Sequence, residues 1–81
     1  MTIKLFGIAG DIVGSSTLSL PKSDGAAIQN VASLKAYLYK KYPRLGELSS
    51  IAIAVNKSYA REDTAIDNKD EIALIPPVSG G

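Results

Sequence analysis

One helix in the middle of the chain is the clearest element of this sequence. Val31, Leu34 and Leu38 recur at spacings of three and four, so they form one apolar stripe along a helix. Asn30 stands at the N-cap position, and Pro43 forces the backbone out of the helix at the residue before it. The helix is therefore expected to cover a sheet that the remaining apolar segments build.

Five short segments have the composition of strands. They span residues 3–9, 17–20, 51–55, 58–60 and 71–75. The last of them is nearly all apolar, so we expect it at the centre of the sheet, with a neighbour on each side. The order of hairpin, helix and short strands predicts an α+β fold, a mixed sheet covered by one main helix.

Glycine, proline and polar residues mark the connections. Residues 7–14 predict a turn with a short helical piece, and residues 21–29 predict a loop. Residues 56–57 and 67–70 predict turns, the first of them inside a hairpin. The sheet should therefore be linked by short connections around the main helix.

The chain is 81 residues long, 46% hydrophobic and 21% charged, and it has no cysteine and no histidine. These values are typical of one globular domain with one core, without a disulfide or a zinc site to stabilise it. Catalysis by Ser-His-Asp or Cys-His systems is excluded, because the residues are missing.

Charge and hydropathy argue against two classes of partner. A formal charge of +1 cannot supply the positive field that holds nucleic acid, and no apolar run is long enough to span a bilayer. The first residues do not form a secretory segment, so we expect a soluble cytoplasmic protein. Asp67, Asp70 and Glu71 lack the spacing of a calcium loop, so no metal site is predicted.

The character of the chain changes after residue 75. Pro76 and Pro77 remove two backbone donors and impose an extended conformation on the end of the chain. The last two residues, Gly80 and Gly81, have no side chains and can enter a narrow pocket of another protein. We therefore divide the chain into a folded domain over residues 1–75 and a flexible tail over residues 76–81.

The reactive group of such a tail is the carboxylate of Gly81. A carboxylate is a poor acyl donor, so it must first be activated, most simply as a mixed anhydride with AMP. Attack by a persulfide sulfur then leads to a thiocarboxylate, a nucleophile that is ionised at neutral pH. This chemistry needs no catalytic side chain from the chain itself, which is consistent with the missing cysteine and histidine.

The ending Pro76-Pro77-Val78-Ser79-Gly80-Gly81, with Ala54-Val55-Asn56 and Leu5-Phe6, closely resembles the small subunit of molybdopterin synthase. That family consists of ubiquitin-like sulfur carriers, and the resemblance covers nearly the whole chain. It implies the β-grasp fold, with an extended C-terminal Gly-Gly tail.

The resemblance also implies a function. An adenylating enzyme related to ubiquitin-activating enzymes would use ATP on Gly81, and a sulfur donor would convert the adenylate to the thiocarboxylate. The tail would then enter the large synthase subunit and donate sulfur to cyclic pyranopterin monophosphate in molybdenum cofactor biosynthesis. The chain would act as the small subunit of a sulfurtransferase, in a heterotetramer of two small and two large subunits, with no stably bound cofactor.

The residues expected to contact a partner surround and include the tail. They are Phe6, Leu74, Ile75, Pro76, Pro77, Val78, Ser79 and Gly80. We expect Phe6, Ile75 and Val78 to form an exposed apolar patch that docks the large subunit, while the tail adds a second, deeper contact.

Three other functions are compatible with the same ending. The chain could be the sulfur carrier of thiazole biosynthesis in the thiamine pathway, a protein modifier of ubiquitin type, or a non-covalent binding module. A modifier would place Gly81 in an isopeptide bond to lysine, whereas a binding module would tolerate deletion of Gly80 and Gly81. The Pro76-Pro77-Val78 segment favours the molybdopterin carrier over the thiazole carrier.

Overall fold

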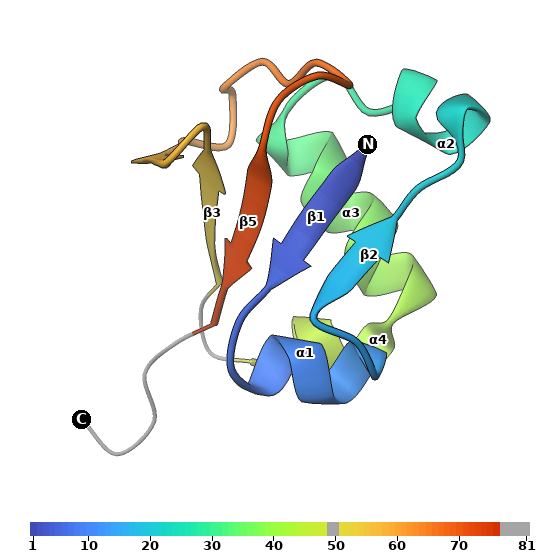
Figure 1. Ribbon diagram of the computed structural model, residues 1–81, viewed down its shortest axis with the longest axis vertical. Helices are drawn as coiled ribbons and strands as arrows, with labels where there is room; N and C mark the ends of the chain where they lie inside the picture. The colour runs from blue at the N-terminus through green and yellow to red at the C-terminus, as the bar shows by residue number, and fades with distance from the viewer. Residues whose placement is uncertain (49–50, 77–81) are drawn as a thin grey trace.

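The computed structural model describes residues 1–48 and 51–76. Within them lies a mixed sheet of five strands in the order β2-β1-β5-β3-β4 (Figure 1). The strands are β1 (Thr2–Leu5), β2 (Thr17–Ser19), β3 (Ala52–Val55), β4 (Ser58–Tyr59) and β5 (Ile72–Ile75). The β1 and β5 strands run parallel, whereas the other neighbours pair antiparallel.

Helices in the described residues cover one face and the two ends of this sheet. They are α1 (Ile8–Val13), α2 (Lys22–Ala26), α3 (Val31–Lys41) and α4 (Pro43–Gly46). Figure 1 shows α3 behind the sheet, α2 near one end of the strands, and α1 with α4 near the other end. The predicted arrangement of one main helix over a mixed sheet is therefore confirmed.

The start of α3 is set by its own sequence. Asn30 Oδ1 accepts a hydrogen bond of 2.9 Å from the backbone N–H of Ser33, and the Asn30 N–H donates one of 3.1 Å to Ser33 Oγ. This reciprocal capping box satisfies backbone donors that the first turn leaves unpaired. Val31, Leu34 and Leu38 are all buried in the core, as the periodicity predicted.

The central position of β5 is confirmed. Leu74 lies opposite both Leu5 of β1 and Ile53 of β3. Because side chains alternate along a strand, Ile72 and Leu74 point toward α3, and both are fully buried.

The predictions for two segments, residues 3–9 and 21–29, were wrong. The first strand ends at Leu5 rather than at residue 9, because Gly7 (φ 53) turns the chain and Ala9 lies buried in α1. Residues 21–29 are not merely a loop, since they contain α2, with Gly25 buried in it. The reason in the second case is tertiary: α2 is held by contacts with distant residues, which local composition does not record.

The hairpin turn at residues 56–57 is confirmed. Asn56 and Lys57 both have positive φ, 52° and 71°, as a two-residue turn of type I′ requires. Asn56 Oδ1 also accepts a hydrogen bond of 2.9 Å from the backbone N–H of Glu71, which fixes this hairpin to the start of β5.

Candidate functional site

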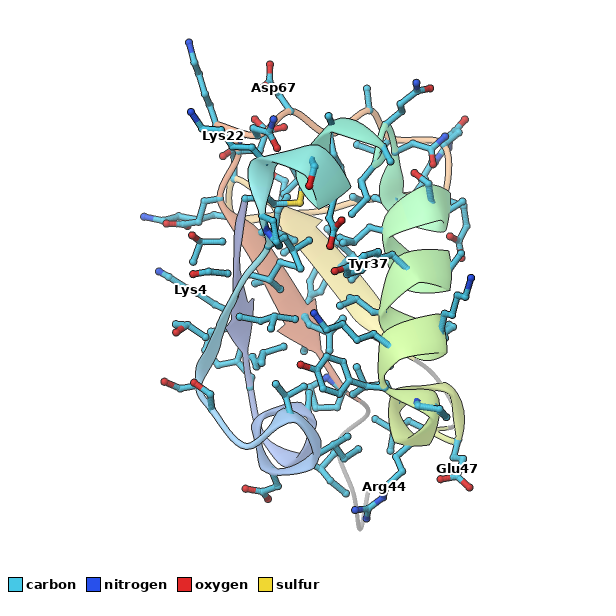
Figure 2. All side chains as sticks on the ribbon, turned by 90° about the vertical axis from the view of Figure 1, so that its right-hand side faces the viewer. Lys4, Lys22, Tyr37, Arg44, Glu47 and Asp67 are labelled. Carbon is cyan, nitrogen blue, oxygen red and sulfur yellow. The ribbon has the colours of Figure 1, made fainter. Side chains whose placement is uncertain are left out.

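The face of the sheet opposite α3 carries the candidate site. Lys4 of β1 points away from α3 (Figure 2), and its strand register places Ala73 beside it on the same face. Ala54 of β3 pairs with Ala73 and with Tyr59 of β4, which brings these residues to that face as well. None of the described helices covers this surface, which we call the outer face (Figure 2).

The outer face contains a shallow hollow of about 330 Å³. Its lining residues come from four strands, the β3–β4 turn and the residues that flank the strands: Lys4, Phe6, Ala54, Lys57, Tyr59, Glu71, Ala73 and Ile75. Phe6 is 51% exposed and Tyr59 76% exposed, so two large aromatic side chains border the small alanines of its floor. An apolar surface of this kind, bordered by charges, is typical of a protein interaction site.

Charged groups stand at the rim of the hollow. Lys4 Nζ lies 3.4 Å from Glu71 Oε1, and both side chains are about half exposed. An exposed pair of this kind adds little stability, because water screens it. Lys57 extends from the β3–β4 turn, so the hollow combines an apolar floor with a polar rim, which is the usual anatomy of an interface.

The base of the tail lies next to this hollow. The Phe6 N–H donates a hydrogen bond of 3.2 Å to the Leu74 carbonyl, and Pro76 follows directly after β5. A Cβ built on Gly7 would lie 3.4 Å from Cγ of Pro76, so the proline ring rests against this glycine. The chain therefore leaves the sheet beside Phe6, at the edge of the hollow.

The structure brings together some of the residues predicted to contact a partner. Phe6 and Ile75 share the lining of the hollow, and Pro76 is half-buried beside Gly7. Leu74 is a correction, because its side chain is fully buried in the core and is not part of the surface. The sequence could not separate Leu74 from Ile75, since both are apolar and only the strand register decides which one faces outward.

The remaining predicted positions are Pro77, Val78, Ser79, Gly80 and Gly81, which lie outside the described residues. The contacts of the whole predicted set with a partner, and the role of the Gly81 carboxylate, stay predictions.

Two exposed apolar residues were missed by the sequence reasoning. Tyr59 lines the hollow, and Ile8 is 47% exposed at the start of α1, close to Phe6 in the chain. Alternation along the hairpin could have placed Tyr59 on the outer face, opposite Ala54. For Ile8 the sequence carries no such signal, because its exposure depends on the turn at Gly7.

Among the described residues, two side chains have a shifted pKa, and neither lines the hollow. A hydrogen bond to Asp24 raises the pKa of Tyr37, with burial as a second cause. The backbone N–H of Asp67, followed by the Asn56 amide, lowers the pKa of Asp70 by hydrogen bonding to its carboxylate. Both shifts arise from hydrogen bonds that join segments distant or adjacent in the fold.

The described residues also provide no metal centre. In residues 1–48 and 51–76 no three carboxylate, histidine or cysteine side chains cluster closely enough to hold an ion. Nor does that part of the chain contain a helix of the length and apolarity needed to cross a membrane.

Comparison with known proteins decides the family. The chain matches the ThiS family over residues 3–81, which includes the whole tail. It belongs to that family. The molybdopterin synthase sulfur carrier subunit of Arabidopsis thaliana is 32% identical to this ThiS-family chain over 80 residues, which cover 98% of this chain and 80% of the relative. The predicted membership among ubiquitin-like sulfur carriers is confirmed.

Solved structures of relatives agree with the fold. The small archaeal modifier protein 1 of Methanosarcina acetivorans superposes with a TM-score of 0.76 and 27% identity, covering 99% of this chain and 94% of that one. A chain in the complex of subunits 1 and 2 of the molybdopterin-converting factor from Helicobacter pylori superposes with a TM-score of 0.63 and 25% identity. The match covers 99% of this chain and 96% of that one. The ThiS-family chain therefore has the β-grasp fold, as predicted.

Proposed function

We propose that this ThiS-family chain is the sulfur-carrier subunit of a molybdopterin synthase and carries sulfur at the carboxyl end of Gly81. The observation that carries the proposal is the similarity to the Arabidopsis thaliana carrier subunit, which extends over 98% of this chain. The family match runs to the last residue, so it includes the Gly-Gly end. The missing cysteine and histidine support a role in which the chain supplies a terminus rather than catalytic side chains.

The first step activates Gly81. Its carboxylate oxygen attacks the α-phosphorus of ATP in the pocket of an adenylating enzyme, an O–P bond forms, and pyrophosphate leaves. The product is an acyl adenylate, whose AMP is a good leaving group. The adenylating enzyme provides ATP and the metal ion that ATP requires.

The second step introduces sulfur. The terminal sulfur of a persulfide attacks the Gly81 carbonyl carbon, a C–S bond forms, and AMP leaves. A thiol reductant then supplies two electrons that cleave the S–S bond of the acyl disulfide. The chain is released as a thiocarboxylate, and the thiol is oxidised to a disulfide.

The third step delivers the sulfur to cyclic pyranopterin monophosphate within the large subunit. The thiocarboxylate sulfur forms a bond to a substrate carbon and displaces the oxygen substituent of that carbon, which leaves with a proton. Water then attacks the Gly81 carbonyl carbon and breaks its C–S bond, so the sulfur stays on the substrate. Gly81 regains its carboxylate, and one sulfur has been transferred. The dithiolene of molybdopterin needs two sulfurs, so two loaded carriers are consumed, which is consistent with a heterotetramer of two small and two large subunits.

The outer-face hollow is the proposed docking surface for the large subunit. Phe6 and Tyr59 expose apolar area that a chain of this size normally buries. Ile75 lies in the same hollow, one residue before the tail base, so docking there would bring the tail to the partner. The Helicobacter pylori relative is described as a complex of subunits 1 and 2, which supports a partner of this kind.

Mass spectrometry of the C-terminal peptide tests the proposal. Trypsin cleaves after Lys69, and the peptide from Asp70 to Gly81 contains no methionine or cysteine. After incubation with the adenylating enzyme, ATP and a persulfide donor, we expect sulfur to replace one oxygen at Gly81. An unchanged carboxylate, with an enzyme that is active on a control carrier, would refute the proposal. Transfer to cyclic pyranopterin monophosphate, and not to a thiazole precursor, would then identify the acceptor.

A second candidate function is that of a protein modifier. The observation in its favour is the TM-score of 0.76 to the small archaeal modifier protein 1 of Methanosarcina acetivorans. The same adenylate of Gly81 would then be attacked by a lysine amine of a target protein, with loss of AMP. Tryptic peptides of cell proteins in which a lysine carries the segment Asp70 to Gly81 through an isopeptide bond, dependent on this chain, would support the modifier.

A further inference from the structure

Lys57 has a backbone conformation that is unfavourable for a residue with a side chain. It is the second residue of the β3–β4 turn, and its φ is 71°, where glycine is the preferred residue. A side chain in this conformation costs stability, and such an outlier is a reason to look for a function of the side chain. Lys57 lines the outer-face hollow, so that function is expected there.

Hydrogen bonds hold the turn that carries Lys57 in place. The Asn56 N–H donates a hydrogen bond of 2.8 Å to the Glu71 carbonyl, and the Glu71 N–H donates one of 2.9 Å to Asn56 Oδ1. The Asn56 side-chain amide also donates to Asp70 Oδ1, at 3.1 Å. These three bonds fix the turn to the residues that precede β5. The backbone of Lys57 is therefore positioned at the rim before any partner binds.

The charge of Lys57 is not compensated within the described residues. Among them, three charged side chains line the hollow, two cations and one anion, so the rim has an excess of one positive charge. The anion is Glu71, whose carboxylate lies 3.4 Å from Lys4 Nζ. The ion pairs of the described residues are Lys4–Glu71 and Lys35–Glu62, and neither includes Lys57. Lys57 is thus the rim cation that remains for a partner.

A partner that docks on the outer face covers this rim. A lysine that loses water without gaining an anion costs free energy, whereas one that meets a carboxylate forms a charge-assisted hydrogen bond. A second copy of this chain would bring a rim with the same excess of positive charge, so the two rims would repel each other. The occupant that fits is a different protein, with an acidic group beside its apolar surface.

We propose that Lys57 is a specificity-determining residue of the outer face: its ammonium group binds a carboxylate of the large subunit at the rim of the hollow. The proposal rests on the function proposed above, and it deepens that function by naming the charge that the large subunit must present. The contact does not involve Gly81, so the unloaded chain is sufficient to measure it.

A series of charge variants tests the contact. Lys57→Arg keeps the charge, Lys57→Gln removes it and Lys57→Glu reverses it. Lys40→Glu is the matched control, because it makes the same change of net charge at an exposed position of α3, behind the sheet (Figure 1). Calorimetry and stopped-flow measure association with the large subunit at low and high ionic strength, and urea denaturation checks each fold.

We expect Lys57→Glu to weaken the complex by about tenfold or more beyond Lys40→Glu, mainly through slower association. Lys57→Gln should weaken it by about threefold, and Lys57→Arg should bind like the wild type. The affinity of the wild type should fall as salt is added, and this fall should be smaller for Lys57→Gln, because salt screens an exposed ion pair. Equal affinities of Lys57→Glu and Lys40→Glu, or the same salt dependence in the wild type and Lys57→Gln, would overturn the proposal.

Lys57→Gly separates binding from stability. This variant removes the ammonium group together with the strain of a side chain at φ 71°, so it should raise the free energy of unfolding. It should nevertheless weaken the complex by about threefold, like Lys57→Gln. A residue that only closes the turn would not lower the affinity when its replacement stabilises the fold. A Lys57→Gly chain that is more stable and binds like the wild type would therefore contradict the proposal.

The wild-type chain distinguishes failure of the proposed function from failure of this contact. If the wild type does not bind the large subunit, the proposed function fails at its docking step. If the wild type binds and the Lys57 and Lys40 variants behave alike, only the role of Lys57 fails. Sedimentation equilibrium of the chain alone tests the other occupant. Self-association that Lys57→Glu abolishes would assign the outer face to a second copy and exclude the large subunit there.

Discussion

The hydroxyl of Tyr37 donates a hydrogen bond of 2.8 Å to Asp24 Oδ2 and so fastens α3 to α2 (Figure 2). Lys41 Nζ lies 3.5 Å from the same hydroxyl and 5.7 Å from the centre of the ring. The acceptor is a carboxylate, which makes this bond stronger than one between two neutral groups.

Replacing Tyr37 by phenylalanine should lower the free energy of unfolding by about 1 kcal/mol, because the bond is lost while the ring stays packed. Urea denaturation at neutral pH measures the change. Tyr59→Phe is the control, since the Tyr59 side chain is 76% exposed and has no hydrogen bond within the described residues. Equal losses in both variants would contradict the prediction.

The same hydrogen bond predicts that the free energy of unfolding falls at alkaline pH. The hydrogen bond to Asp24 raises the pKa of Tyr37 above its ordinary value of 10.0. Because this pKa is raised in the folded chain, the hydrogen bond contributes fully to stability below about pH 10. That contribution is lost as the pH rises through the pKa of Tyr37 in the folded chain. Above about pH 10 the wild type should therefore lose stability faster than Tyr37→Phe. Parallel stability curves for the two proteins would contradict this.

The hydrogen bonds of the Asp70 carboxylate predict that the free energy of unfolding falls at acid pH. It accepts a hydrogen bond of 2.8 Å from the Asp67 N–H and one of 3.1 Å from the Asn56 amide, and these bonds lower its pKa. Because this pKa is lowered in the folded chain, the hydrogen bonds of Asp70 stabilise the chain above about pH 4. Their contribution to stability is lost as the pH falls through the pKa of Asp70 in the folded chain. Asp70→Asn should flatten this part of the acid profile in urea denaturation. The exposed Asp63→Asn serves as control, and an equal flattening there would refute the assignment.

Lys57 occupies a turn position that favours glycine. Its φ is 71°, and the preferred sequence of such a two-residue hairpin turn is Asn-Gly. Lys57→Gly should stabilise the chain by about 0.5–1 kcal/mol through relief of this strain. Lys57→Ala removes the same charge and keeps the strained backbone, so it is the control. If alanine stabilises as much as glycine, the backbone is not the cause.

Ile75 tests the proposed docking surface. Ile75→Lys should weaken the complex with the large subunit at least tenfold, about 1.4 kcal/mol, because a charge would be placed in an apolar contact. Calorimetry measures the affinity, and urea denaturation checks the fold. Thr17→Lys adds the same charge to an exposed position of β2, paired with Lys4 and outside the hollow. Unchanged affinity in Ile75→Lys would exclude this surface as the docking site.

One residue added after Gly81 should abolish sulfur transfer and leave the free energy of unfolding unchanged. The carboxylate would no longer stand where the adenylating pocket binds it, whereas the described core does not include the terminus. Thiocarboxylate formation by mass spectrometry is the readout, and intact mass must exclude trimming of the added residue. Full activity of the untrimmed variant would contradict a reaction at the terminal carboxylate.

The sequence alone determined the elements whose signals are local. The spacing of Val31, Leu34 and Leu38, with Asn30 as cap, predicted α3 because a helix repeats every 3.6 residues and its first turn needs a side-chain acceptor. The apolar run of β5 predicted its central position, because a strand with neighbours on both sides must bury most of its surface.

The features that depend on residues far apart in the sequence were decided only by the tertiary structure. The α2 helix exists in a segment of loop-like composition because Tyr37 and the surroundings of Gly25 hold it there. Pairing with Leu5 and Ile53 decided that Leu74 is buried and Ile75 faces the hollow, which four consecutive apolar residues could not reveal. The glycine at position 7 was visible in the sequence, but its contact with Pro76 was not. The two stand near opposite ends of the chain, and only the parallel pairing of β1 with β5 brings them together.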